Sequence, residues 1–412
     1  MTWVFVIVIS LLIVWQHYRE KNWINLISIL MAPYVILVAL NNLLITKLGF
    51  YQIDDDVLVM LLAAFLLFFI GGLPFNAGKI YHVREADNIE KLGMYDIGMM
   101  NGILYLIGII GLAKIAILYF QGSFSAENID AAEGVMGNGI VGHLLLASYS
   151  ILPIVFLYWT YNRKIKYLLG ILMIFVITFA SLVKYNIIGL FVSVFIFILL
   201  YRKSLLKRAV LILVATTIAI FFGNYALTFF IKGASSAVSY SFYLGHLWTY
   251  MSGSLIYDNY IFTKGLAVGL GTGYKLMTFL CALPNMFLNK FAGITLFPHT
   301  RKNDLLTSSF GETSNVTDAI GYLFPSKGNW SEIFFWAITI FVLGLLFALI
   351  YRKNTRKSNK YNTFIANFLC YFVFFSFFGT FYINSSPWEI LVYSAIIPNL
   401  FYGRKVKIKW RR

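Results

Sequence analysis

The chain alternates long apolar stretches with short polar ones. A membrane-spanning helix must cover ~30 Å of hydrocarbon, which takes about 20 mostly apolar residues. Apolar runs near that length lie at 2–16, 23–45, 57–73, 98–120, 140–161, 167–183, 185–201, 209–231, 331–351, 362–383 and 388–402. This pattern predicts an all-α polytopic integral membrane protein with about eleven transmembrane helices.

The composition agrees with this fold class. Of the 412 residues, 60% are apolar and only 12% are charged, against about 25% charged residues in an average soluble domain. A soluble globular enzyme needs a charged surface, and this chain has too few charged residues to form one. A disordered chain would be poor in apolar and aromatic residues. The composition therefore excludes both classes. Cys281 and Cys370 lie far apart within apolar runs, so they suggest neither a disulfide framework nor a metal site.

The basic residues indicate an orientation. The net charge is +16, and 23 of the 33 Lys and Arg residues fall in alternate connections and in the C-terminal tail. Cytoplasmic loops collect such residues, so we expect an extracytoplasmic N-terminus and a cytoplasmic C-terminus. The charge surplus is thus a topology signal and predicts no nucleic-acid partner. The tail at 403–412 is expected to contact anionic membrane lipid.

One connection, 232–330, is far longer than the others and lies on the predicted outer side. Loops of this length in compact proteins are usually functional. It separates a bundle of about eight spans at 1–231 from about three more at 331–402. Its apolar stretches at 237–262 and 276–291 are expected to form interfacial or re-entrant helices. They could instead be two further spans, which would give thirteen.

Polar residues of this loop are the candidates for chemistry. Arg301 is the only Arg on the predicted outer side, and Lys302 and His299 stand beside it. The planar guanidinium of Arg can donate two hydrogen bonds at once to a diphosphate. The alternative interpretation is that these three residues form a solvated basic turn without a ligand. Glu312 and Asp318 are candidates for a general base, although Thr317 and Asp318 could simply begin a helix. No spacing typical of metal ligands occurs, so we expect no metal and no cofactor.

Aromatic and polar residues of the stretch around 246–260 could bind sugar, although aromatic residues also gather at membrane interfaces by default. The candidates there are His246, Trp248, Tyr250, Asp258 and Tyr260. Asn315 and Thr317 are further candidates for substrate binding. Lys114 is the only basic residue deep within a predicted span, and an ionisable group there suggests function.

Two segments resemble a known family. Tyr250-Met-Ser-Gly-Ser-Leu-Ile-Tyr-Asp258-Asn-Tyr260 is similar to the Tyr-x-(Ser/Thr)-Gly and Asp-x-Tyr segment of the Wzy-type oligosaccharide repeat-unit polymerases. Thr313-Ser-Asn315-Val-Thr317-Asp-Ala-Ile-Gly321-Tyr-Leu-Phe-Pro resembles that family's Asn-Val-(Tyr/Phe)-Thr segment, which is followed by Gly and an aromatic residue. Many spans and one long outer loop in the second half add to the likeness. Some members carry Arg in two outer loops, and here the earlier loop, 121–139, has none.

The resemblance implies a membrane glycosyltransferase of the bacterial inner or plasma membrane that polymerises undecaprenyl-diphosphate-linked oligosaccharides into O-antigen, capsule or exopolysaccharide of the cell envelope. It implies that Arg301, with Lys302 and His299, binds the diphosphate, and that Glu312 or Asp318 is the base. A flippase and a chain-length regulator of the same pathway would be partners. An O-antigen ligase-type transferase shares this layout, and a lipid-linked oligosaccharide transporter is an alternative from another class.

Overall fold

The computed structural model is built almost entirely of helices. It describes residues 1–44, 46, 52–76, 92, 94–122, 139–181, 184–201, 205–232, 240–263, 271–298, 306–307, 313–314, 317–326, 328–356 and 362–403. The chain divides into two compact units, of which the first comprises Met1–Ile80, Val238–Arg356 and Tyr371–Trp388, and the second comprises the remainder.

The first unit contains most of the long segment 232–330. Its helices are α1 (Thr2–Glu20), α2 (Leu26–Leu43), α3 (Asp55–Asn76), α12 (Tyr240–Thr263), α13 (Thr272–Leu280), α14 (Ala282–Ala292) and α15 (Trp330–Arg356). Short 3₁₀ helices are η3 (Gly321–Leu323), η6 (Phe374–Phe377) and η7 (Phe381–Ile383). Strands β1 (Leu306–Thr307) and β2 (Thr313–Ser314) form a two-residue antiparallel ladder, with Leu306 opposite Ser314.

The second unit contains α5 (Ile97–Phe120), α7 (Gly139–Ser148), α8 (Leu152–Asn162), α9 (Ile165–Ala180), α10 (Lys184–Tyr201), α11 (Leu206–Lys232), α16 (Asn362–Asn367) and most of α17 (Ser385–Leu400). The π-helix η5 (Phe368–Val373) and the start of α17 cross between the units in sequence. Lys114 is half-buried and lies in the second half of α5.

Five helices of the described residues, α1, α2, α3, α5 and α15, are long and apolar enough to cross a membrane. A sixth crossing is formed if α7 and α8, which meet at a 48° bend, count as one broken span. Helices occupy all eleven apolar runs that the sequence marks out, but several are shorter than a spanning helix. The structure therefore supports a helical membrane protein, and the number eleven stays a prediction.

The bend between α7 and α8 has a local cause. Pro153 stands in the first turn of α8 and has no N–H to donate to the carbonyl of Tyr149, one turn earlier. The side chain of Asn367 donates to that carbonyl instead, at 3.3 Å, and also to the Ser394 hydroxyl at 2.6 Å. A side-chain amide thus satisfies the backbone group that the proline leaves open.

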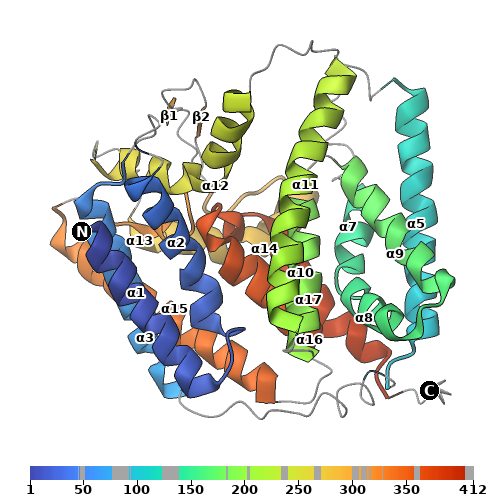
Figure 1. The fold of residues 1–412 in the computed structure, drawn as a ribbon, viewed down its shortest axis with the longest axis horizontal. Helices are drawn as coiled ribbons and strands as arrows, with labels where there is room; N and C mark the ends of the chain where they lie inside the picture. The colour runs from blue at the N-terminus through green and yellow to red at the C-terminus, as the bar shows by residue number, and fades with distance from the viewer. Residues whose placement is uncertain are drawn as a thin grey trace. The chain divides into compact units, whose positions relative to one another are not determined.

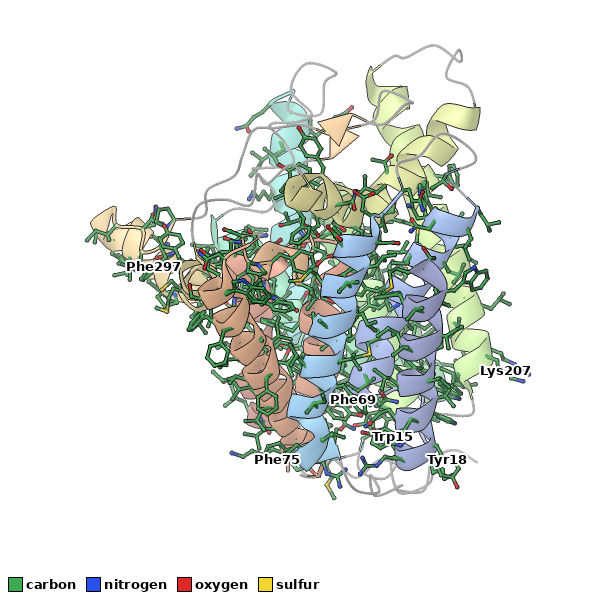
Figure 2. The ribbon with its side chains drawn as sticks, turned by 90° about the vertical axis from the view of Figure 1, so that its left-hand side faces the viewer. Trp15, Tyr18, Phe69, Phe75, Lys207 and Phe297 are labelled. Carbon is green, nitrogen blue, oxygen red and sulfur yellow. The ribbon has the colours of Figure 1, made fainter. Side chains whose placement is uncertain are left out.

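Helices α3 and α15 approach each other through two glycines. A Cβ added at Gly71 would lie 2.1 Å from the carbonyl oxygen of Phe341, and one at Gly344 would lie 2.1 Å from that of Phe68. Only glycine permits such reciprocal contact, which is how small residues bring membrane helices together. Figure 1 shows α1, α2, α3 and α15 grouped in this unit, and Trp15 of α1 packs edge-on against Phe69 of α3 at 5.1 Å (Figure 2).

Asparagine side chains tie α2, α3 and α12 together at one end of the unit. Asn42 accepts from the backbone N–H of Ile53 at 3.0 Å and donates to its carbonyl at 2.9 Å. Asn259 of α12 accepts from the N–H of Asp54 at 2.7 Å and donates to the carbonyl of Gln52 at 3.3 Å. The residues that precede α3 are thereby fixed against both helices, and α12 receives a defined position.

The run 362–383 was expected to be one of the spans, and the structure shows that it is not one regular helix. An apolar helical stretch covers Asn362–Phe377, and it passes from α-helix through the π-helix η5 to the 3₁₀ helix η6. It ends before Gly379, and η7 follows after a break. The backbone carbonyl that ends η6, at Phe377, accepts a hydrogen bond from the hydroxyl of Ser254 in α12. The irregular end of the run is thus bonded to α12.

Candidate functional site

Helix α12 is buried on all sides over its second half. Every residue from Ser252 to Asn259 is buried, although this stretch contains Ser252, Ser254, Asp258 and Asn259. Buried polar groups must be hydrogen-bonded, and here Ser252 bonds to the Trp248 carbonyl at 2.9 Å while Asn259 contacts the start of α3. Helix α12 is therefore an internal element of the first unit that carries a carboxyl group into protein surroundings.

The two segments that carry the family resemblance meet at Asp258. The backbone N–H of Asp318 donates to Oδ2 of Asp258 at 3.0 Å, although the two residues are 60 positions apart. Gly321 packs directly on the same carboxyl, because an added Cβ there would lie 2.2 Å from Cγ of Asp258. A glycine at this position is therefore required by the close approach of the second segment to α12.

The side chain of Asp318 organises the turn that makes this approach. Its Oδ1 accepts from the backbone N–H groups of Ile320 at 2.7 Å and Gly321 at 2.6 Å, at the start of η3. Asp318 thus holds the turn that leads into η3, whose N-cap residue is Ile320. On the other side, Thr380 donates its hydroxyl to the Thr317 carbonyl at 2.7 Å. The turn is held by α12 on one side and by the residues before η7 on the other.

The two carboxyl groups differ in their electrostatics. Burial, and next the negative charge of Asp318, raises the pKa of Asp258 well above its usual value. Burial also raises the pKa of Asp318 to about 6, but hydrogen bonds from Asp258, from the Gly321 and Ile320 N–H groups and from Tyr34 oppose this rise. Two close carboxyl groups with pKa values pushed apart form an acid and a carboxylate. The direction of the shifts favours Asp258 as the acid of the pair and Asp318 as the carboxylate.

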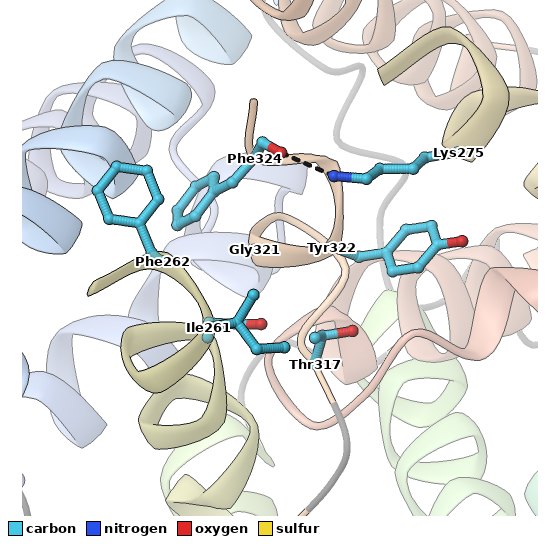
Figure 3. A pocket seen from close by; sticks show the side chains of 8 residues that line it. Ile261, Phe262, Lys275, Thr317, Gly321, Tyr322 and Phe324 are labelled. Carbon is cyan, nitrogen blue, oxygen red and sulfur yellow. Dashed lines mark hydrogen bonds between the residues drawn. The ribbon is translucent and has the colours of Figure 1, made fainter. Parts of the chain in front are cut away.

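A small pocket opens beside Asp258 (Figure 3). With the open mouth included, the empty space is about 360 Å³. The cavity volume that a water molecule can occupy is about 30 Å³. A water needs roughly 10–15 Å³ of such space, so the interior takes a few waters or a small polar group. The pocket is lined by Asp258, Ile261, Phe262, Lys275, Thr317, Gly321, Tyr322 and Phe324.

Lys275 brings a cation to this pocket from α13. Its ammonium donates to the backbone carbonyl of Phe324 at 2.8 Å (Figure 3), and the side chain is buried. Burial lowers the pKa of Lys275 to about 8, against the opposing charges of Glu332 and Asp258. An ammonium has three N–H donors, so a pocket-lining Lys of this kind can neutralise an anion that enters.

The remaining predicted residues have different surroundings. The indole N–H of Trp248 donates to Oδ1 of Asn41 in α2 at 3.2 Å, which is a structural contact. Tyr260 is half-exposed and stacks with Tyr257 at a ring distance of 6.4 Å. Thr317 lines the pocket. His246 and Tyr250 lie in α12, but their side chains are outside the described residues. The same holds for all atoms of the last group, His299, Arg301, Lys302, Glu312 and Asn315.

Sequence reasoning assigned no specific role to three members of this site. Lys275 was a candidate only as part of the scatter of loop lysines with Lys232, Lys264 and Lys290, Gly321 was a motif residue without a role, and Tyr34 belongs to a predicted span. Lys275 has a sequence signal, because it falls on the same helical face as Thr272, Thr278 and Phe279, which are all buried. The contacts of Gly321 and Tyr34 depend on the folded chain and have no local pattern.

No three potential metal ligands of the His, Cys, Asp and Glu types lie together in the part of the chain that the structure describes. Comparison with known protein families, with curated proteins and with solved structures finds no match to this chain. The chemistry of the site must therefore be argued from its own residues.

Proposed function

We propose that the protein is a membrane glycosyltransferase that polymerises undecaprenyl-diphosphate-linked oligosaccharide units on the extracytoplasmic side. The observation that carries this proposal is the contact between the two segments that resemble the polymerase family. Asp318 and Gly321 of the second segment pack on Asp258 of the first. A buried acid–carboxylate pair beside a pocket with a buried Lys supplies the groups that such a transfer needs. The eleven spans, the outer N-terminus and the cytoplasmic C-terminus belong to this proposal.

In the proposed reaction an acceptor sugar hydroxyl attacks the anomeric carbon of the lipid-linked glycan. A new glycosidic C–O bond forms, and the bond between the anomeric carbon and the diphosphate oxygen breaks with its electron pair. The hydroxyl proton passes to Asp258 while the proton of Asp258 passes to Asp318, so the pair ends with two protons. Because the pocket interior is small, only the reacting groups enter it, and the sugar rings remain at its mouth.

The departing diphosphate carries the growing negative charge. The ammonium of Lys275 lines the same pocket as Asp258, so it can stabilise that charge in protein surroundings that strengthen electrostatic interactions. Arg301, Lys302 and His299 remain the predicted ligands of the rest of the diphosphate. Glu312 is the alternative base, and Asn315 with Thr317 would orient sugar.

The proposal is tested with Asp258→Asn and Asp318→Asn in cells that lack the native gene. An amide keeps the shape and one acceptor oxygen of each side chain but cannot relay a proton, so we expect a loss of rate of about 10²–10⁴-fold. On a gel of surface glycan, the polymer ladder should collapse to a single repeat unit with protein levels unchanged. Asp54→Asn, at an exposed residue, is the matched control and should leave the ladder intact.

The outcomes separate the candidate classes. A normal ladder from Asp258→Asn contradicts the proposed base relay. Complete polymer that stays on the lipid carrier in the deletion strain indicates a ligase-type transferase. Repeat units that remain on the cytoplasmic side indicate a transporter, and purified protein would then form no glycosidic bond between lipid-linked units in vitro.

A further inference from the structure

Helix α14 and the residues after it form a small structure that stands apart from the bundle. The chain reverses at Gly293 (φ +67°), and residues 294–298 run back along the helix. We call residues 282–298 the α14 finger. Figure 2 shows its Phe297 segment projecting sideways from the helices of the first unit. Only Ala282 of α14 is buried, and six of its eleven residues are exposed among the described residues.

The polar face of α14 is used internally. Asn285 donates to the carbonyl of Leu296 at 2.7 Å and accepts from its N–H at 2.8 Å. Asn289, one turn later, donates to the hydroxyl of Thr295 at 2.9 Å. The hydroxyl of Tyr274 in α13 donates to the carbonyl of Pro298 at 3.1 Å. These bonds fix residues 294–298 to one side of α14, and the other side makes none of them.

The free side of α14 is apolar. At 100° per residue, Leu283, Pro284, Phe287, Leu288 and Phe291 share one face, opposite Asn285 and Asn289. Phe287 is 52% exposed and Phe291 is 79% exposed. Ile294 and Leu296, in the segment that runs back along α14, are exposed too. Residues 271–298 contain no Asp or Glu, and the only exposed cation among them, Lys290, lies 5.9 Å from the Phe291 ring.

This apolar surface continues onto a membrane-crossing helix. Helix α13 packs against α15, where Gly273 faces the Phe335 ring. The exposed aromatic residues at the start of α15 are Trp330, Phe334 and Phe335, with Trp330 81% exposed. Because α15 is long and apolar enough to cross a membrane, we expect its exposed apolar side chains to face lipid. Trp and Lys at such a boundary are typical of the membrane–water interface.

We infer that the α14 finger lies in the interface of the outer leaflet, with Phe287 and Phe291 among the lipid chains. An uncovered amphipathic helix of this kind inserts its apolar face about 5–10 Å into the boundary between head groups and acyl chains. The helix is too short to cross, since eleven residues span only about 16 Å. Insertion into a membrane interface rests on burial and contacts alone, whereas the assignment to the outer leaflet rests on the proposed function.

The insertion has a consequence for the pocket. Helix α13, which begins one turn before Lys275, turns Met277 and Leu280 outward and Thr272, Lys275 and Phe279 inward. One short helix therefore carries an apolar outer face, next to the finger, and the cation of the pocket on its inner face. The pocket is held at the depth of lipid head groups, where the diphosphate of a lipid-linked substrate lies.

The test is spin labelling of the full-length protein in lipid nanodiscs. Single cysteines replace Phe287 and Phe291 in a background with Cys281→Ser and Cys370→Ala. Phe334→Cys on α15 is the lipid-facing reference, and Thr295→Cys on the polar side is the matched control in the same finger. Power saturation is measured with oxygen, which partitions into lipid, and with a water-soluble nickel chelate.

Labels at 287 and 291 should show the high ratio of oxygen to nickel accessibility found at 334, and the label at 295 should show the reverse. A nickel-dominated signal at 287 and 291 would mean that the finger stands in water, which overturns the inference. Protection from both reagents would mean that protein, from this chain or a second copy, covers the face, and that result overturns it equally. Circular dichroism of each variant shows whether its helices are retained.

Discussion

Helices α12 and α14 come from the same long segment and have similar apolar content, but their surroundings are opposite. Residues 252–259 of α12 are all buried, and Ser254, Asp258 and Asn259 bond to other elements. Helix α14 uses its two asparagines within its own finger and leaves Phe287 and Phe291 exposed. Hydrogen bonds from polar side chains to distant elements therefore mark the helix that is inside, whereas the polar side chains of the outer helix bond only within their own finger.

Truncation of one apolar side chain on each helix should give the largest contrast. Leu255 of α12 is fully buried, so Leu255→Ala should leave a cavity and cost about 2–5 kcal/mol of the free energy of unfolding. Phe291→Ala removes no protein packing and should stay within about 0.5 kcal/mol. Thermal unfolding of both variants in the same detergent measures the difference. Equal losses would show that α14 is packed against protein.

The glycine that touches α12 offers the next test. Gly321→Ala would place a Cβ 2.2 Å from Cγ of Asp258, so either the turn or the carboxyl must move, at a cost of about 1–3 kcal/mol. Separation of Asp258 from Asp318 should also remove the polymer ladder. Gly102→Ala in α5, where no atom lies within 4 Å of the added Cβ, is the control and should be neutral. An intact ladder from Gly321→Ala would separate the carboxyl pair from function.

The pH dependence of the transfer should be bell-shaped. Activity needs the pair to be singly protonated, and the Asp318 carboxylate is lost as pH falls below its pKa of about 6. The rate should then drop about tenfold per pH unit, equivalent to about 1.4 kcal/mol. Above the Lys275 pKa of about 8 the ammonium is lost, which gives the alkaline limb. Initial rates of purified protein measure both limbs.

Lys275→Arg should move only the alkaline limb of that profile, since Arg remains charged at all pH values of the assay. The acid limb should keep its midpoint because the carboxyl pair is unchanged. A profile that is flat between pH 4.5 and 7 would exclude the carboxyl pair as the base.

The helical fold could be predicted well because each apolar run carries its own signal. The sequence could not reveal the break in 362–383, since a continuous apolar run reads the same as α-, π- or 3₁₀ helix. It also could not distinguish α12 from α14 by hydropathy. The distinction lies in where the polar residues bond: Asn259 contacts residues some 205 positions away, whereas Asn285 contacts one 11 positions away.

The candidate site was predicted in pieces. Asp258, Thr317 and Asp318 were each singled out, but nothing local showed that the first accepts a hydrogen bond from the third. Asp318 was expected to serve as base or as the start of a helix; it precedes η3 by a turn that its side chain holds, and it is also half of the carboxyl pair. Arg301 and Glu312, the other expected centres of chemistry, lie outside the described residues and stay predictions.

The glycine contact between α3 and α15 can form only after a long delay during synthesis of the chain. Asn76 ends α3 and Trp330 begins α15, so 254 positions separate the two helices along the chain. At roughly 5–20 residues per second, the ribosome needs about 13–50 s between them. During that interval Gly71 and Phe68 have no α15 to pack on, and the whole second unit except its last segments is made meanwhile. The first unit is therefore synthesised first but completes its packing late. Until then the face of α3 that contacts α15 is uncovered in every nascent chain and is accessible to a membrane chaperone.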